Sequence, residues 1–464
     1  MKALVVRSAI VASLGGLIFG FDTAVISGAE EAIQQQFGLS DGMLGFTVTT
    51  ALLGTILGAL SAGRPADALG RKKVLVIIGV LYVVGAVGSA LAPNVWLLQL
   101  FRFLGGIGVG ASSVVAPIYT AEVAPPAHRG RLVGLVQFNI VLGILVAYAS
   151  NAVIRGLIDG EHAWRWMLGV MTAPAVVFLL LLFTVPETPR WLMSVRRGEE
   201  ARATSLRLCT TEAEADTQID EIRSSIAADE QALKVPFFTR DHRRVILLAV
   251  AIAFFNQMSG INAILYYAPR VMQQAGATTN TAFIMSVGVG LMNLVATMAA
   301  LTVIDRLGRR RLMLVGSIGY LLSLGFLAAV MFYYESRGFT GTSATLVLVG
   351  LMAFIASHAF GQGSVIWVFI SEIFPNRLRG RGQSLGSLTH WVFAAATSWA
   401  FPPIVGALGG GVAFSIFFVF MVGQLVWVLK VMPETKGVPL EEMEARLGVH
   451  YDRGDTAGEA AGGR

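Results

Sequence analysis

The sequence predicts an all-α membrane protein with twelve transmembrane helices in two similar halves of six. Its composition, with 55% hydrophobic residues, 14% charged residues and a mean hydropathy of +0.68, lies outside the usual range of soluble proteins. About twelve apolar runs reach the roughly 20 residues that a helix needs to cross a hydrocarbon core of about 30 Å. Motifs of the first half also recur in the second, which indicates a duplicated six-helix unit.

The apolar runs form two groups separated by one long polar segment. The first six spans are expected near residues 8–28, 44–64, 74–92, 97–120, 132–154 and 165–185. The second six are expected near residues 245–273, 280–304, 312–334, 343–373, 382–407 and 411–432. Because the first run carries Asp22 and lacks a small-residue cleavage site, we interpret it as a span and not as a signal peptide. The expected domains are an N-terminal bundle (1–189), a linker (190–244), a C-terminal bundle (245–432) and a tail (433–464).

Charged residues between the spans predict further helices and the orientation of the chain. Their helical spacing in the polar connection 186–244 predicts short amphipathic helices, and another helix is expected near Leu440–Leu447, before a disordered Gly/Ala-rich end. Excess positive charge stays cytoplasmic, and thirteen Lys and Arg lie in the loops at 64–73, 129–131, 306–311 and 377–381. We therefore expect a multi-pass protein of the bacterial inner (plasma) membrane with both termini cytoplasmic. This topology explains the net charge of +6 without nucleic acid as a partner.

Groups suited to covalent chemistry or metal binding are few. The lone Cys209 excludes a disulfide framework and a Cys-based metal site, and we expect no metal and no cofactor. The glycine cluster Gly105–Gly110 lies inside a predicted helix and is not followed by a Walker-type Lys-Ser/Thr pair, so it favours helix packing over nucleotide binding. The sequence therefore does not predict an enzyme.

Three motifs recur in the same order in the two halves, each at a predicted cytoplasmic helix end. Asp67-Ala-Leu-Gly-Arg-Lys is repeated as Asp305-Arg-Leu-Gly-Arg-Arg, 238 residues later. Glu122 followed by Arg129-Gly is repeated as Glu372 followed by Arg379-Gly, 250 residues later. Pro186-Glu-Thr is repeated as Pro433-Glu-Thr, 247 residues later. Three motifs at nearly one spacing are the expected result of duplication.

Asp22 is an ionisable side chain inside the first predicted span, where a charge is costly and usually marks an ion or proton path. Counting about 1.5 Å per residue from the span ends places Asp22 roughly 9 Å and Arg102 roughly 8 Å below the outer surface. The two spans run in opposite directions, so the two side chains are at the right depth to meet. The alternative is an ion pair with a purely structural role.

With these motifs the chain resembles the sugar porters of the major facilitator superfamily over nearly its whole length. The resemblance also includes Gln257 and Asn262 in Asn-Gln-Met-Ser-Gly-Ile-Asn-Ala-Ile-Leu-Tyr-Tyr, Asn293 in span 8, and Gly363-Ser-Val-Ile-Trp367 in span 10. It implies the major facilitator fold, in which two pseudo-symmetric six-helix bundles enclose a central sugar site and open alternately to either side.

The resemblance implies sugar contacts through carboxamides, which both donate and accept hydrogen bonds, and through aromatic rings, which cover the apolar faces of the sugar. The implied substrate-binding residues are Phe19, Gln137, Asn256, Gln257, Asn262, Asn293, His358, Trp367, His390 and Trp391, and the implied extracellular gate is Tyr266 with Tyr267. Asn256, His358 and His390 depart from the family pattern and leave the sugar open. For any single polar residue, interhelical packing is the alternative. Ser364 stands where the family has Pro, so we expect a stiffer span 10.

The repeated charged motifs match a cytoplasmic latch of the family, with Arg71 and Arg309 reaching Glu372 and Glu122 across the two bundles. The implied members are Asp67, Arg71, Glu122, Arg129, Asp305, Arg309, Glu372 and Arg379. Such pairs would exist in the outward-open state only and would bias the direction that the transporter faces. The alternative is that these residues merely satisfy helix termini and the positive-inside rule.

The resemblance also implies proton coupling, because the position of Asp22 is an Asp in the proton symporters and an Asn in the facilitative glucose carriers. The expected function is proton-coupled symport of a monosaccharide, either a hexose or a pentose, by a monomer in the lipid bilayer. Two alternatives remain open, a facilitative sugar uniporter and a non-transporting sugar sensor.

Overall fold

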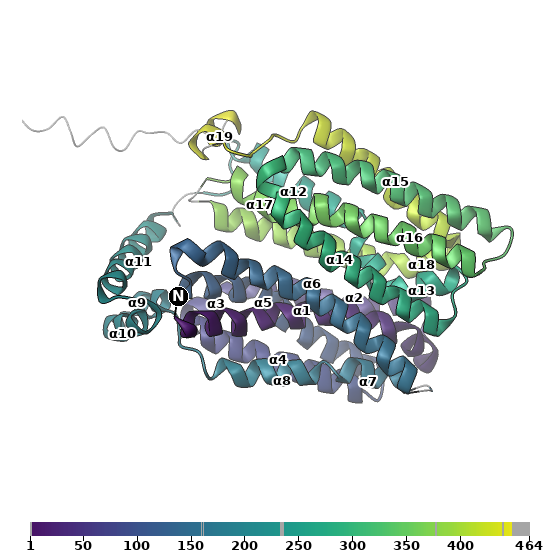
Figure 1. The fold of residues 1–464 in the computed structure, drawn as a ribbon, viewed down its shortest axis with the longest axis horizontal. Helices are drawn as coiled ribbons and strands as arrows, with labels where there is room; N and C mark the ends of the chain where they lie inside the picture. Colours follow the sequence, from purple (N-terminus) through teal and green to yellow (C-terminus); the bar gives the residue numbers. More distant parts are fainter. Residues whose placement is uncertain are drawn as a thin grey trace, which may run out of the picture.

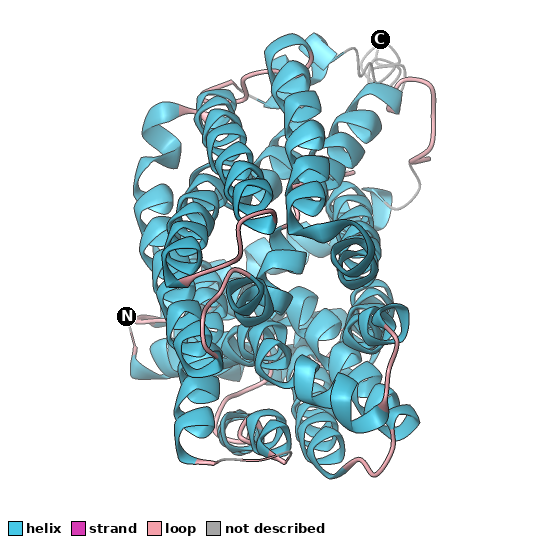
Figure 2. Cartoon of the chain, turned by 90° about the vertical axis from the view of Figure 1, so that its right-hand side faces the viewer, coloured by secondary structure: helices cyan, strands magenta, loops and turns pink. Residues whose placement is uncertain are grey.

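The fold was examined in a computed structural model, which describes residues 2–158, 160, 162–232, 236–375, 378–438 and 440–447. Within these residues the regular secondary structure is entirely helical (Figure 2). Eleven helices there are long and apolar enough to cross a bilayer. The last of them, α18 (Arg379–Lys430), has 52 residues, more than twice the length that one crossing needs. Gly409, with φ 82° and ψ 163°, breaks it into two spans, so the number of crossings agrees with the predicted twelve.

The first half contains six spans close to the predicted positions. They are α1 (Ala3–Phe37), α2 (Asp41–Ser61), α4 (Arg71–Leu91), α5 (Val95–Val123), α6 (Arg129–Leu157), and the pair α7 (Ala163–Gly169) and α8 (Thr172–Leu182). A short helix, α3 (Gly63–Leu69), occupies most of the predicted loop at 64–73, and a 3-10 turn, η1 (Pro126–His128), precedes α6. Several helices extend beyond the apolar runs, because polar residues at their ends lie outside the hydrocarbon core and still continue the helix.

The second half repeats this order with two interrupted spans. Its helices are α12 (Arg243–Met258), α13 (Ile261–Gln274), α14 (Thr279–Leu307), α15 (Arg309–Glu335), α16 (Gly341–His358), the π-helical turn η2 (Ala359–Gly363), α17 (Ser364–Ile373) and α18. The expected stiffness of span 10 stays a prediction. Although Ser364 replaces a proline, η2 still interrupts the span, and a π turn leaves backbone hydrogen bonds out of the regular α-helical pattern.

The linker forms the three helices α9 (Pro189–Ser194), α10 (Gly198–Leu208) and α11 (Glu212–Ala232), as its charge spacing predicted. They lie at the same end of the molecule as α19 (Leu440–Leu447), and we call this the linker end and the opposite one the far end (Figure 1). The predicted disordered segment after residue 447 lies outside the described residues.

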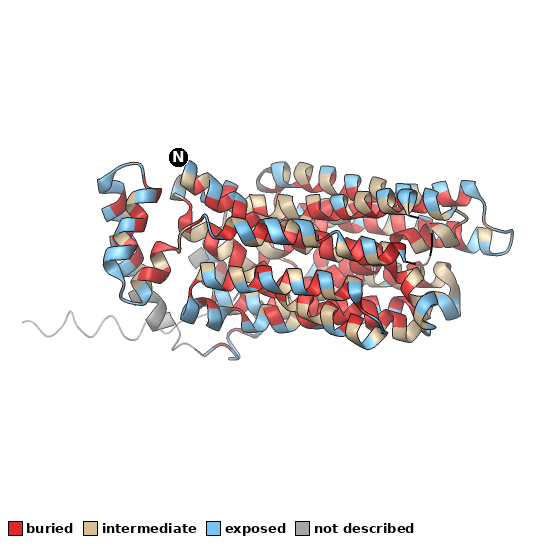
Figure 3. Cartoon of the chain, turned by 90° about the horizontal axis from the view of Figure 1, so that it is seen from below, coloured by how far each residue is buried: buried red, intermediate tan, exposed pale blue. Residues whose placement is uncertain are grey.

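Apolar side chains occur both inside and outside the bundles. Buried positions face neighbouring helices, and the outer helix faces carry many exposed ones (Figure 3). Large apolar residues are among the exposed, including Leu180, Leu322 and Val419 at 62%, 71% and 66%. In water such a surface would aggregate, whereas in a bilayer it contacts lipid tails. The distribution fits a multi-pass membrane protein.

Candidate functional site

Asp22 on α1 and Arg102 on α5 form a buried ion pair, as their predicted depths allowed. Asp22 Oδ1 lies 2.6 Å from Arg102 Nη1, and the exposed fractions of the two side chains are 8% and 5%. A cavity of about 10 Å³, which has room for roughly one water molecule, touches both residues and Ser89 of α4. The role of this ion pair in proton coupling stays a prediction.

The predicted carboxamides of span 7 meet at the break between its two helices. Gly260, with φ 86°, separates α12 from α13, and an added Cβ there would overlap the ring of Phe417. Across this break Asn262 Nδ2 donates to Gln257 Oε1 at 2.8 Å, and Gln257 Nε2 donates to Asn256 Oδ1 at 2.8 Å. Three predicted sugar contacts are therefore joined in one network.

The predicted aromatic residues form a row beside this network. Phe19 of α1 lies 5.6 Å from Trp391 of α18 between ring centroids, so the row joins the two bundles. His390 lies 4.8 Å from Trp391 and 5.3 Å from Trp367 of α17. Gln257 Nε2 is 3.2 Å from both ring nitrogens of His390, which links the rings to the carboxamides.

Among the described residues, three other predicted sugar contacts make no hydrogen bond to this arrangement. The Nδ1 atom of His358 is 2.6 Å from the hydroxyl of Tyr320 on α15. Asn293 accepts from Thr297 Oγ1 at 3.4 Å, one turn along α14. Among the described residues, no polar contact joins either Asn293 or Gln137 of α6 to the carboxamides of span 7. Their contact with sugar stays a prediction.

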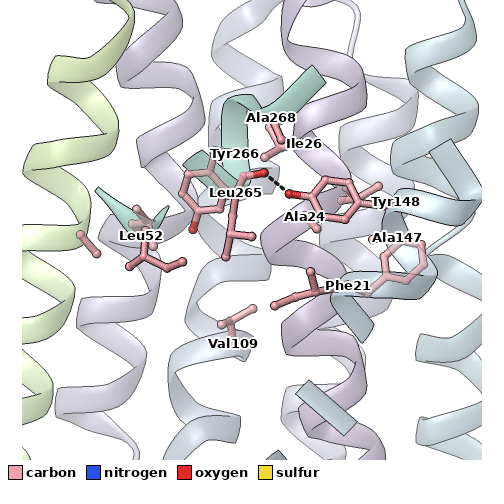
Figure 4. Close-up of a cluster of buried hydrophobic side chains, with 14 of the residues drawn as sticks. Phe21, Ala24, Ile26, Leu52, Val109, Ala147, Tyr148, Leu265, Tyr266 and Ala268 are labelled. Atoms are coloured by element: carbon pink, nitrogen blue, oxygen red, sulfur yellow. Dashed lines mark hydrogen bonds between the residues drawn. The ribbon is translucent and has the colours of Figure 1, made fainter. Parts of the chain in front are cut away.

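The predicted gate residues Tyr266 and Tyr267 are buried at the contact between the bundles. Tyr267 departs from helical geometry, stacks on Phe401 at 5.5 Å and donates to Ser398 O at 3.3 Å. Figure 4 shows Tyr266 next to Leu265, whose carbonyl accepts a 2.6 Å hydrogen bond from Tyr148 Oη of α6 across the two halves. The contact between the bundles around Tyr266 and Tyr267 is therefore closed in this structure.

In this structure two latch arginines pair within their own halves, and the latch, which is expected in the outward-open state only, stays a prediction. Arg71 contacts Glu122 at 3.2 Å, and Arg309 contacts Glu372 at 2.7 Å, each inside its own half. Each arginine begins a helix directly after a glycine with positive φ, Gly70 before Arg71 and Gly308 before Arg309. Asp67 pairs with Arg71 at 3.0 Å.

Two further predicted latch residues, Arg129 and Arg379, take no part in the pairs described above. Arg129 lies exposed on the wall of a cavity of about 570 Å³ between α5 and the linker helices. The Nε atom of Arg379 is buried and has no hydrogen-bond partner among the described residues. The side chain of Asp305 lies outside the part of the chain that the structure describes.

The Pro-Glu-Thr motifs complete one charge cluster in each half. Thr188 donates to Glu122 at 2.5 Å, and Thr435 donates to Glu372 at 2.6 Å. Glu187 accepts from the backbone N–H of Lys72 at 3.1 Å, which places a carboxylate at the N-terminus of α4.

Glu434 accepts from the backbone N–H groups of Arg309 and Arg310 at the start of α15 in the same way. Burial raises the pKa of the Glu187 carboxyl above its ordinary value. All three repeated motifs therefore meet, once in each half.

Sequence reasoning missed an ionic contact that joins the bundles at the far end. Glu30 of α1 is 1% exposed, and its Oε2 atom lies 2.9 Å from Arg270 Nη1 of α13. Arg270 Nη2 is also 3.6 Å from Asp41 of α2. We call Glu30, Asp41 and Arg270 the clasp. The signal available in the sequence was a charged residue directly after Pro269 in an otherwise apolar half-helix.

Known proteins resemble the chain in sequence and in fold. The family profile described as "Sugar (and other) transporter" matches residues 8–447. The arabinose-proton symporter of Bacillus subtilis is 34% identical over 437 residues, which cover 93% of each chain. The glucose transporter GlcP of Staphylococcus epidermidis is 34% identical and covers 96% of this chain and 98% of its own.

A solved structure shows the same architecture. The partially occluded inward open conformation of the xylose transporter XylE from E. coli matches with a TM-score of 0.83 and 33% identity, and it covers 94% of this chain and 100% of that one. The fold is therefore that of XylE, a major facilitator with two six-helix halves. The chain belongs to the sugar transporter family.

Proposed function

We propose that this protein is a proton-coupled symporter, which imports a hexose or pentose by alternating access of its two bundles. The observation that carries the proposal is the buried Asp22–Arg102 pair at 2.6 Å in a member of the sugar transporter family. The named relatives support the substrate class, since they carry arabinose with protons, glucose and xylose. We propose that the linker end is the cytoplasmic side and that both termini are cytoplasmic, which the positive charge of the loops supports.

Coupling follows from the cost of moving a charge inside a membrane protein. Ionised Asp22 accepts a charge-assisted hydrogen bond from Arg102, which holds α1 against α5. Protonation removes the negative charge and weakens this bond, so α1 becomes free to shift with the sugar bound. The cavity of about 10 Å³ beside the pair provides a place for the water that delivers the proton.

The sugar binds where the carboxamides of span 7 and the aromatic row lie together. Asn262 keeps a carbonyl oxygen and one N–H for hydroxyl groups after its bond to Gln257. Trp367 and Trp391 supply rings for the C–H faces of the sugar. Phe19 comes from the other bundle and packs against Trp391 with the two ring planes tilted by 53°, so occupancy of the site is coupled to the bundle arrangement.

The structure fits the inward-facing state of such a cycle. Contacts between the bundles occur at the far half, where Arg270 pairs with Glu30 and the indole N–H of Trp399 donates to Gly42 O at 3.1 Å. The match to an inward open transporter agrees with this interpretation. We propose that the bundles comprise residues 1–189 and 245–432 and that one chain suffices for transport.

The test uses vesicles that contain the purified protein or its Asp22→Asn variant, with labelled sugars and acid outside. We expect gradient-driven accumulation by the parent, whereas the variant only equilibrates sugar down its own gradient. Asp220→Asn is the matched control, because Asp220 makes an exposed linker pair with Arg223 at 3.2 Å. Equal, pH-independent equilibration by parent and variant would make the protein a uniporter, and sugar binding without flux would make it a sensor.

A further inference from the structure

A continuous chain of hydrogen bonds leads from the predicted sugar site into the interior of the C-terminal bundle. Beyond Asn262, Gln257 and Asn256, the Nδ2 atom of Asn256 lies 3.5 Å from Gln362 Oε1. Gln362 Nε2 donates to Gln424 Oε1 at 2.8 Å, and Gln424 Nε2 donates to Ser317 Oγ at 2.8 Å. We call the six residues together the carboxamide chain.

The inner members of this chain are completely buried and lie away from the sugar. Gln362, Gln424 and Ser317 are each 0% exposed, and they belong to η2, α18 and α15. Burying an unbonded carboxamide costs free energy, so two carboxamides in an apolar core need a full set of partners. The carboxamide chain supplies those partners. It ends at the hydroxyl group of Ser317, whose Oγ in turn donates to Met313 O at 2.7 Å.

The π turn brings Gln362 to this place. Gly316 of α15 and Gly361 of η2 face each other so closely that a Cβ on Gly316 would lie 2.7 Å from the Cα of Gly361. The insertion of a π turn changes the direction of the following side chains relative to a regular α-helix. Gln362 therefore spans the space between α12 and the second half of α18.

The direction of the hydrogen bonds is the same along the whole chain, because each amide donates to the next and accepts from the one before. One amide cannot be turned without disturbing its neighbours. At the sugar site, both N–H groups of Gln257 are consequently used, by Asn256 and His390, and only its oxygen can accept another bond. The donors and acceptors offered to the sugar therefore depend on residues that never touch it.

From this arrangement we infer that Gln362, anchored by Gln424 and Ser317, is a positioning residue that sets the sugar specificity of the carrier. It holds Asn256, and through Asn256 it orients Gln257 and Asn262. The inference rests on the proposed sugar transport and adds the determinant of hydroxyl selectivity.

The experiment compares Gln424→Met with the parent, since Gln424 is remote from the sugar and methionine has a similar shape. Tryptophan fluorescence is titrated with two pairs of C4 epimers, D-glucose with D-galactose and D-xylose with L-arabinose, and KM and kcat are measured for the same sugars. We expect the half-saturation ratio within at least one pair to change by about three- to tenfold, the worth of one hydrogen bond, while kcat changes little. Ser317→Ala is a milder second variant and should shift the same ratio in the same direction.

The matched control is Gln99→Met, which removes another buried carboxamide that donates to Thr47 at 2.9 Å, outside the sugar site. It should lower thermal stability without changing the epimer ratio. Unchanged ratios in both Gln424→Met and Ser317→Ala, or an equal change in Gln99→Met, would overturn the positioning role. If the parent binds none of the four sugars, the proposed function fails and the inference falls with it.

Discussion

Removal of the clasp arginine should open the far end in a pH-dependent manner. In Arg270→Met the carboxylate of Glu30 lacks the arginine that lies 2.9 Å from it in the parent. This loss costs free energy only in the closed form, where the carboxylate is buried. A glutamate with an ordinary pKa near 4.3 escapes this cost by binding a proton, which requires about 4 kcal/mol at pH 7. This free energy is the upper limit by which the variant favours the open form over the closed form, and it corresponds to a roughly 500-fold change in their equilibrium constant at pH 7. At pH 5 the same calculation gives about 1 kcal/mol, or roughly fivefold.

The assay measures the distance between the two bundles at the far end. Spin labels at Leu157→Cys and Leu408→Cys report it, because both positions are exposed ends of helices from different halves. The background carries Cys209→Ser, which removes the lone native cysteine. We expect a population with a longer distance in Arg270→Met at pH 7 that shrinks toward pH 5.

The control for this measurement is Arg337→Met, which changes a far-end arginine that follows α15 and stacks on Tyr333 of that helix at 4.0 Å. It should keep the parent distances at both pH values. Two results contradict the reasoning. An unchanged distance in Arg270→Met would mean that the clasp does not hold the far end closed, and a pH-independent opening would mean that the charge of Glu30 is not responsible.

Two further predictions concern folding. Gly260→Ala should lower the melting temperature, because alanine at φ 86° costs about 1–2 kcal/mol and its Cβ would overlap Phe417. The control Gly288→Ala places its Cβ in open space and should leave the melting temperature unchanged. Equal melting temperatures of the two variants would contradict this account of the break in span 7. The pKa of Glu187 is raised, so the folded protein binds a proton there more tightly than the unfolded chain does. This group therefore favours folding at low pH, and its contribution is lost as the pH rises from 4.5 through the raised value. The melting temperature of Glu187→Gln should therefore fall less than that of the parent as the pH rises through this range. An identical dependence of the melting temperature on pH in both proteins would exclude this role of Glu187.

Much of the fold could be predicted because membrane-spanning helices are local structures. A run of apolar residues satisfies its own backbone hydrogen bonds within one helix, so its position needs no knowledge of its neighbours. The repeated motifs at Asp67, Glu122 and Pro186 predicted the duplication, and each set of three meets at the base of its own bundle. The last two predicted spans also stay separate, because Gly409 breaks the long helix α18 between them.

The candidate site was only partly predictable. The depth argument for Asp22 and Arg102 used rise per residue alone and placed them within reach, and their contact at 2.6 Å agrees with it. Arg71 and Arg309 pair within their own halves in this structure, and the cross-bundle latch of the outward-open state stays a prediction, because a moving protein makes different ion pairs in different states.

The sequence by itself determined the class of the protein, its twelve crossings, its internal duplication and the buried acid–base pair, because hydropathy, spacing and motif order are properties of the chain. Only the tertiary structure decided which polar groups meet across helices. The clasp joins residues 240 positions apart, and the carboxamide chain joins five separate elements. Such contacts depend on helix rotation, on the π turn at Ala359–Gly363 and on the side of the membrane that is closed. These are consequences of how the helices pack, and no local pattern of residues contains them.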